Sequence, residues 1–101
     1  MFARVTPYQL KSGARDAAIA TMEEMTADIM ALPGLTQFIN VLGQDGSGYV
    51  ISLVESQEIS DENAERVRAL WGRMGPHLAE MPSSHGAEVV ADWTTAAVPA
   101  G

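Results

Sequence analysis

The chain has 101 residues, of which 47% are hydrophobic and 19% are charged, and it contains no cysteine. This length predicts a single domain, and the composition is that of a globular protein rather than a disordered one. Without cysteine, disulfides, thiolate nucleophiles, iron–sulfur clusters and thiolate zinc sites are excluded. The net charge of −7 argues against binding to nucleic acid, because phosphate backbones attract clustered Lys and Arg.

From the first residues we expect no targeting signal. Residues 1–7 lack a basic segment followed by a long apolar one, and no window approaches the roughly 18 apolar residues of a membrane span. We therefore expect a cytoplasmic protein that contacts no membrane. One domain should cover residues 1–96, and residues 97–101 should form a tail.

The first expected strand covers residues 2–10. Pro7 lies inside it and lacks the N–H that a sheet ladder uses, which indicates a sheet edge, a bulge or an early end of pairing. Residues 11–13 form a turn, and Ser12 is suited to cap the helix that follows. One face of this helix is apolar through Ala18, Met22, Met25 and Ile29. Pro33-Gly34 should end it.

A hairpin forms the centre of the chain. Its strands, residues 35–42 and 49–55, are rich in apolar side chains, and the loop contains Asp45-Gly46, which tolerates the positive φ of a tight turn. Neither strand alternates cleanly between apolar and polar, which is typical of a sheet covered on both faces. Because two helices cover one face, we expect a second copy of the chain to cover the other.

The second helix is expected to open at Ser60, and its apolar residues again share one face: Ala64, Val67, Trp71, Met74 and Leu78. Gly75-Pro76 should break or kink it near Met74. A final strand alternates Ala87, Val89, Ala91 and Trp93 with more polar neighbours. The order strand, helix, strand, strand, helix, strand predicts a ferredoxin-like α+β sandwich.

Several side chains are candidates for ligand contacts. On the first strand, small Ala3 and Val5 should face the helices, which leaves Arg4 and Tyr8 on the other side to orient an acidic or hydroxylated ligand. The alternative for Arg4 is an ion pair with an acidic residue such as Asp92.

On the second strand, Phe38 is a further candidate for ligand contact. A buried Asn40 must be hydrogen-bonded, across the strands or between subunits, or else by a ligand.

The two tryptophans and two histidines each have an ordinary structural explanation beside a functional one. Trp71 packs the core or lines a pocket, and Trp93 is expected at a dimer interface. His77 follows Gly-Pro at a helix end, where its cation suits the helix dipole, and it is also the candidate general base. His85 should face solvent. Two histidines so far apart, without a neighbouring carboxylate pattern, make a poor metal site, so we expect no metal.

Four segments carry a resemblance to a known family. They are the Lys-Ser-Gly turn at 11–13, Leu-Pro-Gly-Leu at 32–35, the hairpin end Val-Glu-Ser at 54–56, and the second helix before a terminal strand. Together they resemble the antibiotic biosynthesis monooxygenase-like domains of the dimeric α/β-barrel superfamily, over nearly the whole length. The resemblance implies a homodimer whose sheets pack face to face, with an apolar cavity in each subunit.

The resemblance also implies a function, since some of these proteins oxidise aromatic polyketides without metal or flavin. We expect a cofactor-independent monooxygenase acting on an apolar aromatic or phenolic molecule, with His77 as base and Arg4 as electrostatic partner of the substrate. Trp71, Asn40 and Tyr8 would orient its ring. One alternative is a non-catalytic, dimeric ligand-binding or stress-responsive barrel module. A haem-degrading monooxygenase fits less well, since Trp71 and His77 match but the first strand lacks that branch's asparagine. A regulatory domain that binds an amino acid also fits less well, because it would need a glycine-rich loop directly after the first strand.

Overall fold

The elements follow one another in the predicted order, although each predicted helix is divided in two. The structure, a computed structural model, describes residues 1–95; the predicted tail at 97–101 lies outside the described residues. The elements are β1 (Phe2–Gln9), α1 (Arg15–Glu24), α2 (Thr26–Met30), β2 (Leu35–Leu42), β3 (Ser47–Val54), α3 (Gln57–Glu62), α4 (Ala64–Met74), the 3₁₀ turn η1 (Gly75–His77) and β4 (His85–Glu88).

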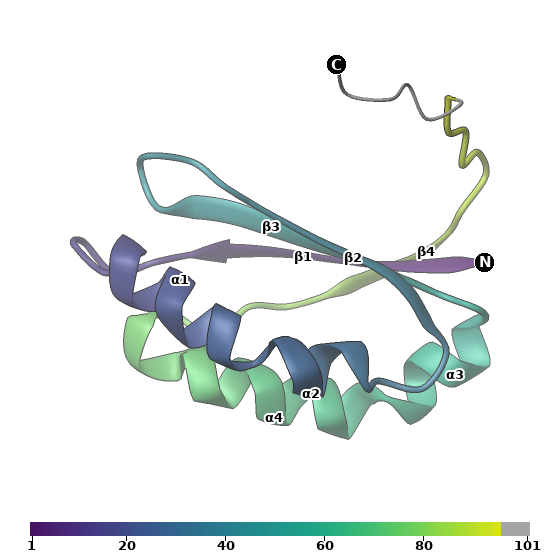
Figure 1. The fold of residues 1–101 in the computed structure, drawn as a ribbon, viewed down its shortest axis with the longest axis horizontal. Helices are drawn as coiled ribbons and strands as arrows, with labels where there is room; N and C mark the ends of the chain where they lie inside the picture. Colours follow the sequence, from purple (N-terminus) through teal and green to yellow (C-terminus); the bar gives the residue numbers. More distant parts are fainter. Residues whose placement is uncertain (96–101) are drawn as a thin grey trace, which may run out of the picture.

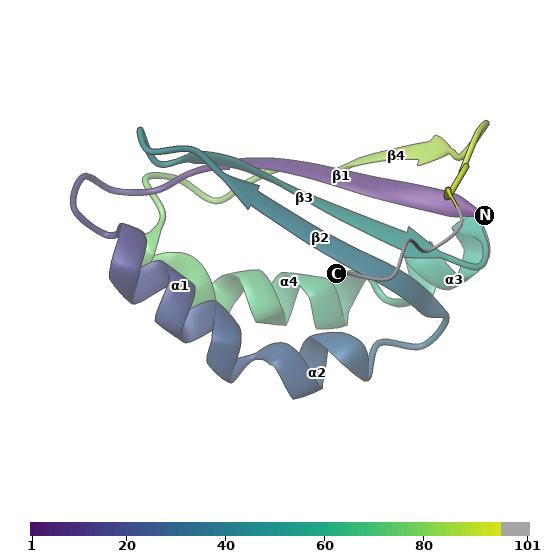
Figure 2. The same cartoon turned by 45° about the horizontal axis from the view of Figure 1, so that its top comes forward.

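The strands form one antiparallel sheet in the order β2-β3-β1-β4, and the helices form a single layer against one of its faces (Figures 1 and 2). Within residues 1–95 the other face carries no helix. This arrangement confirms the predicted ferredoxin-like α+β fold. β1 lies between β3 and β4, and its pairing with β4 ends at Val5, before Pro7, as the missing N–H of Pro7 indicated.

The predicted apolar face of the first helix is confirmed. Ala18, Met25 and Ile29 are buried in the core and Met22 packs against it. The predicted cap is wrong, because α1 begins at Arg15 and follows Ala14 rather than Ser12. Met25 ends α1 and begins α2, so the buried face continues through the division.

The second helical segment begins earlier than predicted. Ser56 caps α3, since its Oγ accepts a hydrogen bond from the backbone N–H of Ile59 at 3.2 Å. Ser60, the predicted start, is instead inside α3 and only 1% exposed. α4 ends at Met74, directly before Gly75-Pro76, as predicted.

The final strand is shorter than predicted, and it does not reach Trp93. β4 pairs with β1 up to Glu88, which lies opposite Phe2, and the N–H of Val89 donates to the carbonyl of Met1 at 3.2 Å. Because β1 begins there, residues after Val89 have no further β1 backbone to pair with. The chain turns away from the helical layer at this point (Figure 1), and Trp93 is 93% exposed.

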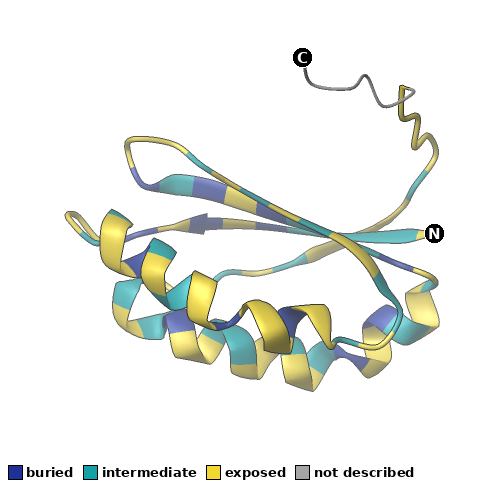
Figure 3. Ribbon diagram, viewed as in Figure 1, coloured by how far each residue is buried: buried dark blue, intermediate teal, exposed yellow. Residues whose placement is uncertain are grey.

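The core lies between the sheet and the helices (Figure 3). Its buried members come from both layers: Tyr8, Leu10, Ala18, Met25, Ile29, Val50, Met74 and Leu78. On the opposite face of the sheet, Ile39, Val41 and Tyr49 remain exposed. One face is therefore packed, and the other presents apolar side chains to the surroundings.

Candidate functional site

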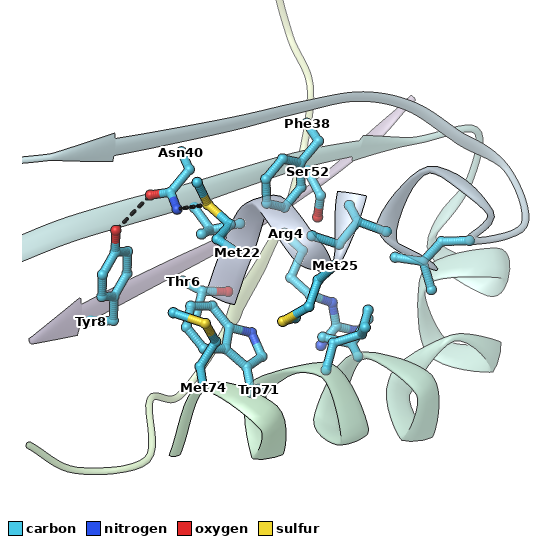
Figure 4. A pocket seen from close by; sticks show the side chains of 15 residues that line it. Arg4, Thr6, Tyr8, Met22, Met25, Phe38, Asn40, Ser52, Trp71 and Met74 are labelled. Atoms are coloured by element: carbon cyan, nitrogen blue, oxygen red, sulfur yellow. Dashed lines mark hydrogen bonds between the residues drawn. The ribbon is translucent and has the colours of Figure 1, made fainter. Parts of the chain in front are cut away.

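A cavity of about 60 Å³ lies inside this packed layer, between the sheet and α1, α2 and α4 (Figure 4). Most of its wall is apolar, and the polar side chains come from the strands. The lining residues are Arg4, Thr6, Tyr8, Met22, Met25, Ile29, Leu32, Phe38, Asn40, Val50, Ser52, Val67, Leu70, Trp71 and Met74. An apolar wall with a few converging polar groups is the usual form of a small-molecule site.

Strand β1 supplies the cavity with Arg4, Thr6 and Tyr8, because alternate residues of a strand share a face. The predicted orientation of this strand is therefore wrong: these three side chains face the helices, and Ala3 and Val5 face the open side. Side-chain size misled the prediction, since the space under the helices accommodates the large Tyr8 ring. Thr6 is 2% exposed, and its hydroxyl is hydrogen-bonded to that of Ser84 at 2.7 Å.

Tyr8 and Asn40 form the polar end of the cavity. The hydroxyl of Tyr8 donates to Oδ1 of Asn40 at 2.6 Å, from β1 across β3 to β2 (Figure 4). Gly48 on β3 permits this bond, because a Cβ there would lie 2.5 Å from Cζ of Tyr8 and 2.6 Å from its hydroxyl oxygen. The predicted cross-strand bond of Asn40 is therefore present, and it spans two strand spacings.

Tyr8 is held on its other side by Trp71, whose ring centroid lies 5.5 Å away at an interplanar angle of 53°. Burial raises the pKa of the Tyr8 hydroxyl above its ordinary 10.0, while the hydrogen bond to Asn40 and the charge of Arg15 act in the opposite direction. The phenol is therefore protonated near neutral pH and serves as a hydrogen-bond donor.

Arg4 lies nearer the start of β1 than Tyr8 and is partly buried. Its Nε and Nη2 donate to Oγ of Ser60 at 3.3 and 3.1 Å, and Nη2 also donates to the Ser60 carbonyl at 3.2 Å. The predicted ion pair with Asp92 is wrong, because the chain leaves β1 at Val89. Within residues 1–95 the one salt bridge joins Arg73 and Asp28 on the surface, so Arg4 has no carboxylate partner there.

Methionines form the movable part of the wall. Met22, Met25 and Met74 all line the cavity, and Nδ2 of Asn40 contacts the sulfur of Met22. Met22 and Asn40 also line two open hollows beside the cavity, of about 240 and about 280 Å³. Met22 therefore lies where the cavity and the two hollows adjoin, and an unbranched thioether can change rotamer easily.

Five of the seven predicted site residues line this cavity: Arg4, Tyr8, Phe38, Asn40 and Trp71. His77 does not; its Nε2 lies 2.9 Å from Oγ1 of Thr21, and it stands outside the lining set, so the haem-type pairing of Trp71 with His77 is not assembled at the cavity. Trp93 does not line the cavity either, since it lies on the exposed segment after β4.

The sequence interpretation missed Met22, Ser60 and Gly48. Of these, Gly48 carried a readable signal, since a glycine within a strand often marks a close approach.

None of the fifteen lining residues is Asp, Glu or His. Among residues 1–95, no group of three or more His, Cys, Asp or Glu side chains is placed to hold a metal ion. No helix in that part of the chain is long and apolar enough to cross a membrane. The polar chemistry of the cavity therefore rests on hydrogen-bond donors and on one guanidinium.

No family model and no curated protein matches the sequence, whereas solved structures match it closely in shape. A crystal structure of an antibiotic biosynthesis monooxygenase superposes with a TM-score of 0.71 at 15% identity, covering 90% of this chain and 100% of the other. NE2512 from Nitrosomonas europaea, of unknown function, gives 0.77 at 15% identity and 95% coverage of both chains. Rv0793 from Mycobacterium tuberculosis gives 0.72 at 14%, covering 92% and 98%. The chain therefore has the fold of the antibiotic biosynthesis monooxygenase-like proteins, as its sequence resemblance predicted.

Proposed function

We propose that the cavity binds an apolar aromatic or phenolic small molecule and that the protein oxidises this molecule with dioxygen, without a cofactor. The observation that carries the proposal is the apolar cavity that holds Arg4 at one point and the Tyr8–Asn40 pair at another. The fold shared with a crystallised antibiotic biosynthesis monooxygenase supports it.

The proposed reaction starts from a phenol that is bound as its anion. The ring gains one oxygen atom and loses two hydrogens, which leave with the second oxygen as water, so that 1-naphthol and dioxygen give 1,4-naphthoquinone and water. The electrons come from the ring itself. The protein would act by excluding water and by stabilising the negative charge on the substrate, which makes the ring electron-rich.

The lining residues divide this work. Arg4 supplies the positive charge that favours the ionised substrate. The single proton of the Tyr8 hydroxyl is donated to Asn40, so the Tyr8 oxygen is available to accept a hydrogen bond from a ligand hydroxyl. Trp71, held against Tyr8, and Phe38 offer the flat apolar surfaces on which an aromatic ring packs.

The cavity must expand to accept such a ligand. Its volume of about 60 Å³ holds a few waters, whereas sites for small molecules usually begin near roughly 300 Å³. The adjoining hollows of about 240 and about 280 Å³ supply the missing space once Met22 turns aside. Entry past Met22 is therefore part of the proposal.

The second candidate function is a non-catalytic binding module. One observation favours it: the cavity wall contains no carboxylate or imidazole that could accept the proton of a phenol. The enzyme proposal then needs a substrate whose proton leaves to solvent, assisted by the charge of Arg4. The binding module needs no proton acceptor at all.

We also propose that the chain acts as a homodimer that joins through the open sheet face. In residues 1–95, no acidic or basic side chain from β1, β2 or β3 points to this face, which carries Val5, Ile39, Val41, Tyr49 and Ile51. Elsewhere the chain is strongly acidic. Two copies therefore meet with least repulsion at this face, and we propose that exposed Trp93 also packs on the partner.

The test incubates the protein with 1-naphthol under isotope-labelled dioxygen and measures 1,4-naphthoquinone by mass spectrometry. We expect a quinone with one labelled oxygen and labelled water, above the rate with heat-denatured protein and absent without dioxygen. His77→Ala should keep this activity, since His77 lies outside the cavity, whereas Trp71→Ala should reduce it at least tenfold. Binding without quinone formation would favour the binding module.

A further inference from the structure

We infer that the ligand of this cavity is an aromatic acid, with a carboxylate held at Arg4 and a second oxygen held at the other end by Tyr8 and Asn40. This inference rests on the proposed function, in that it assumes an aromatic ligand in the cavity. It adds the class of compound, and it assigns the charge of Arg4 to a carboxylate of that ligand rather than to its phenol oxygen. It is carried by the placement of one guanidinium among apolar side chains.

The guanidinium of Arg4 is held in place by hydrogen bonds, but some of its N–H groups have no acceptor within residues 1–95. All of its hydrogen bonds within residues 1–95 go to Ser60, from Nε and Nη2, which leaves the two N–H groups of Nη1 without an acceptor there. The fully enclosed side-chain atoms that lack a partner are Nε of Arg15 and Oδ1 of Asn63. Because Nη1 is not among them, it retains open space beside it, where a ligand atom can lie.

Ser60 fixes the orientation of the Arg4 guanidinium, which a mobile arginine on the surface would lack. Ser60 is 1% exposed and lies on α3, which contacts the strand that bears Arg4. Its hydroxyl and carbonyl hold one edge of the guanidinium, and the Arg4 side chain itself lines the cavity. An arginine fixed in this way loses little entropy when it binds a planar carboxylate.

Charge balance points to an anion. A guanidinium that is partly withdrawn from water, as that of Arg4 is, is stabilised by an opposite charge beside it. None of the lining residues is acidic, and within residues 1–95 the paired arginine is Arg73, on the surface. A ligand carboxylate would supply the missing charge and accept hydrogen bonds from Nη1.

The second polar point of the cavity sets the length of the ligand. Tyr8 follows Arg4 by four residues on one strand, which places their Cα atoms about 13 Å apart at roughly 3.3 Å per residue. Between them Thr6 is buried, and its hydroxyl is already bonded to Ser84. The middle of the cavity therefore offers apolar contacts, from Trp71 and Phe38, and the ligand should be an elongated ring system with oxygens at its two ends.

The test compares three matched probes by isothermal titration calorimetry near neutral pH. They are 6-hydroxy-2-naphthoic acid, its methyl ester, and 2-naphthol, which lacks the acid group. We expect the wild-type protein to bind the free acid at least tenfold more tightly than the ester or 2-naphthol. Equal binding of acid and ester would overturn the inference while leaving the aromatic cavity in place, and binding of none would overturn both proposals.

Variants then assign the preference to Arg4. Arg4→Gln should remove the tenfold preference for the acid and leave the ester unchanged, whereas Arg4→Lys should keep part of it, since the charge remains. Arg68→Gln removes an exposed arginine of α4 and should behave as the wild type. An unchanged preference in Arg4→Gln, with a thermal melt showing that the variant is folded, would also overturn the inference.

Discussion

The hydroxyl of Tyr8 on β1 reaches Oδ1 of Asn40 on β2 at 2.6 Å, although β3 lies between the two strands. The bond links β1 to β2 at one end of the cavity. Tyr8→Phe keeps the ring against Trp71 but leaves a partly buried amide oxygen without its donor, so we expect a loss of about 1 to 3 kcal/mol in the free energy of unfolding.

A double-mutant cycle checks this bond directly. Asn40→Leu removes the acceptor, and the effect of Tyr8→Phe should then shrink by roughly 0.5 kcal/mol or more, because the two residues form one unit. Urea unfolding of the wild type, both single variants and the double variant gives the coupling. Strictly additive effects would show that the bond does not contribute to stability.

Gly48 should be indispensable to the same contact. Gly48→Ala places a Cβ 2.5 Å from Cζ of Tyr8, which forces the ring or β3 to shift, and we expect a loss of about 1 to 3 kcal/mol. Gly72→Ala is the matched control, since it lies within α4 with no atom within 4 Å of the added Cβ, and it should gain about 1 kcal/mol. Thermal unfolding of both variants measures the difference, and a stable Gly48→Ala would contradict the packing described.

The titration of Tyr8 should be visible in stability at alkaline pH. Burial raises the pKa of its hydroxyl above the ordinary 10.0, so the folded state holds the proton more tightly than the unfolded state. This contribution is complete below pH 10.0 and is lost as the pH rises through the folded pKa.

The measurement uses Tyr49→Phe, which leaves Tyr8 as the one remaining tyrosine. Its phenolate absorbance in the near ultraviolet should appear above pH 10.0. Tyr8→Phe should in turn lessen the fall in unfolding free energy over the same range. A midpoint below 10.0 would mean that the phenol is not buried as described.

The open sheet face gives a prediction about assembly. Val41→Lys introduces a charge at a position that is 48% exposed in the single chain, so the fold should tolerate it while the dimer dissociates. Met30→Lys is the control, at a 60% exposed position on α2, and should leave the dimer intact. Light scattering after gel filtration gives the mass of each, and a monomeric wild type would overturn the homodimer proposal.

Trp93→Ala extends this test to the segment that follows β4. If Trp93 packs on the partner, as we propose, its loss should weaken the dimer without lowering the thermal stability of the isolated subunit, because the side chain is 93% exposed there. An unchanged dissociation constant would remove Trp93 from the interface.

Local patterns in the sequence predicted the helices and the hairpin well. The apolar spacing of Ala18, Met25 and Ile29 identified the buried face of the first helix, and Gly75-Pro76 correctly marked the end of α4. Asp45 confirmed the turn, since its Oδ1 accepts from the backbone N–H of Ser47 at 3.0 Å. These features depend on residues close together in the chain.

Features that depend on distant partners were not predictable in the same way. Alternation in β1 separates Arg4 and Tyr8 from Ala3 and Val5, but it does not say which set meets the helices. The end of β4 depends on where β1 begins. The orientation of His77 depends on a hydrogen bond with Thr21 of α1, which is distant in the sequence. Most residues of the candidate site were therefore predictable from the sequence, but the face of the sheet on which they lie was not.

A strand has two faces, and β1 uses both. Its even-numbered residues serve the cavity, and its odd-numbered residues serve the face proposed for dimerisation. Inserting one residue near the start of β1 would exchange the two sets, turning the guanidinium outward and a small aliphatic side chain inward. Sequence change in this strand is therefore constrained to substitution at fixed length, and ligand binding and assembly should be gained or lost together when that length changes.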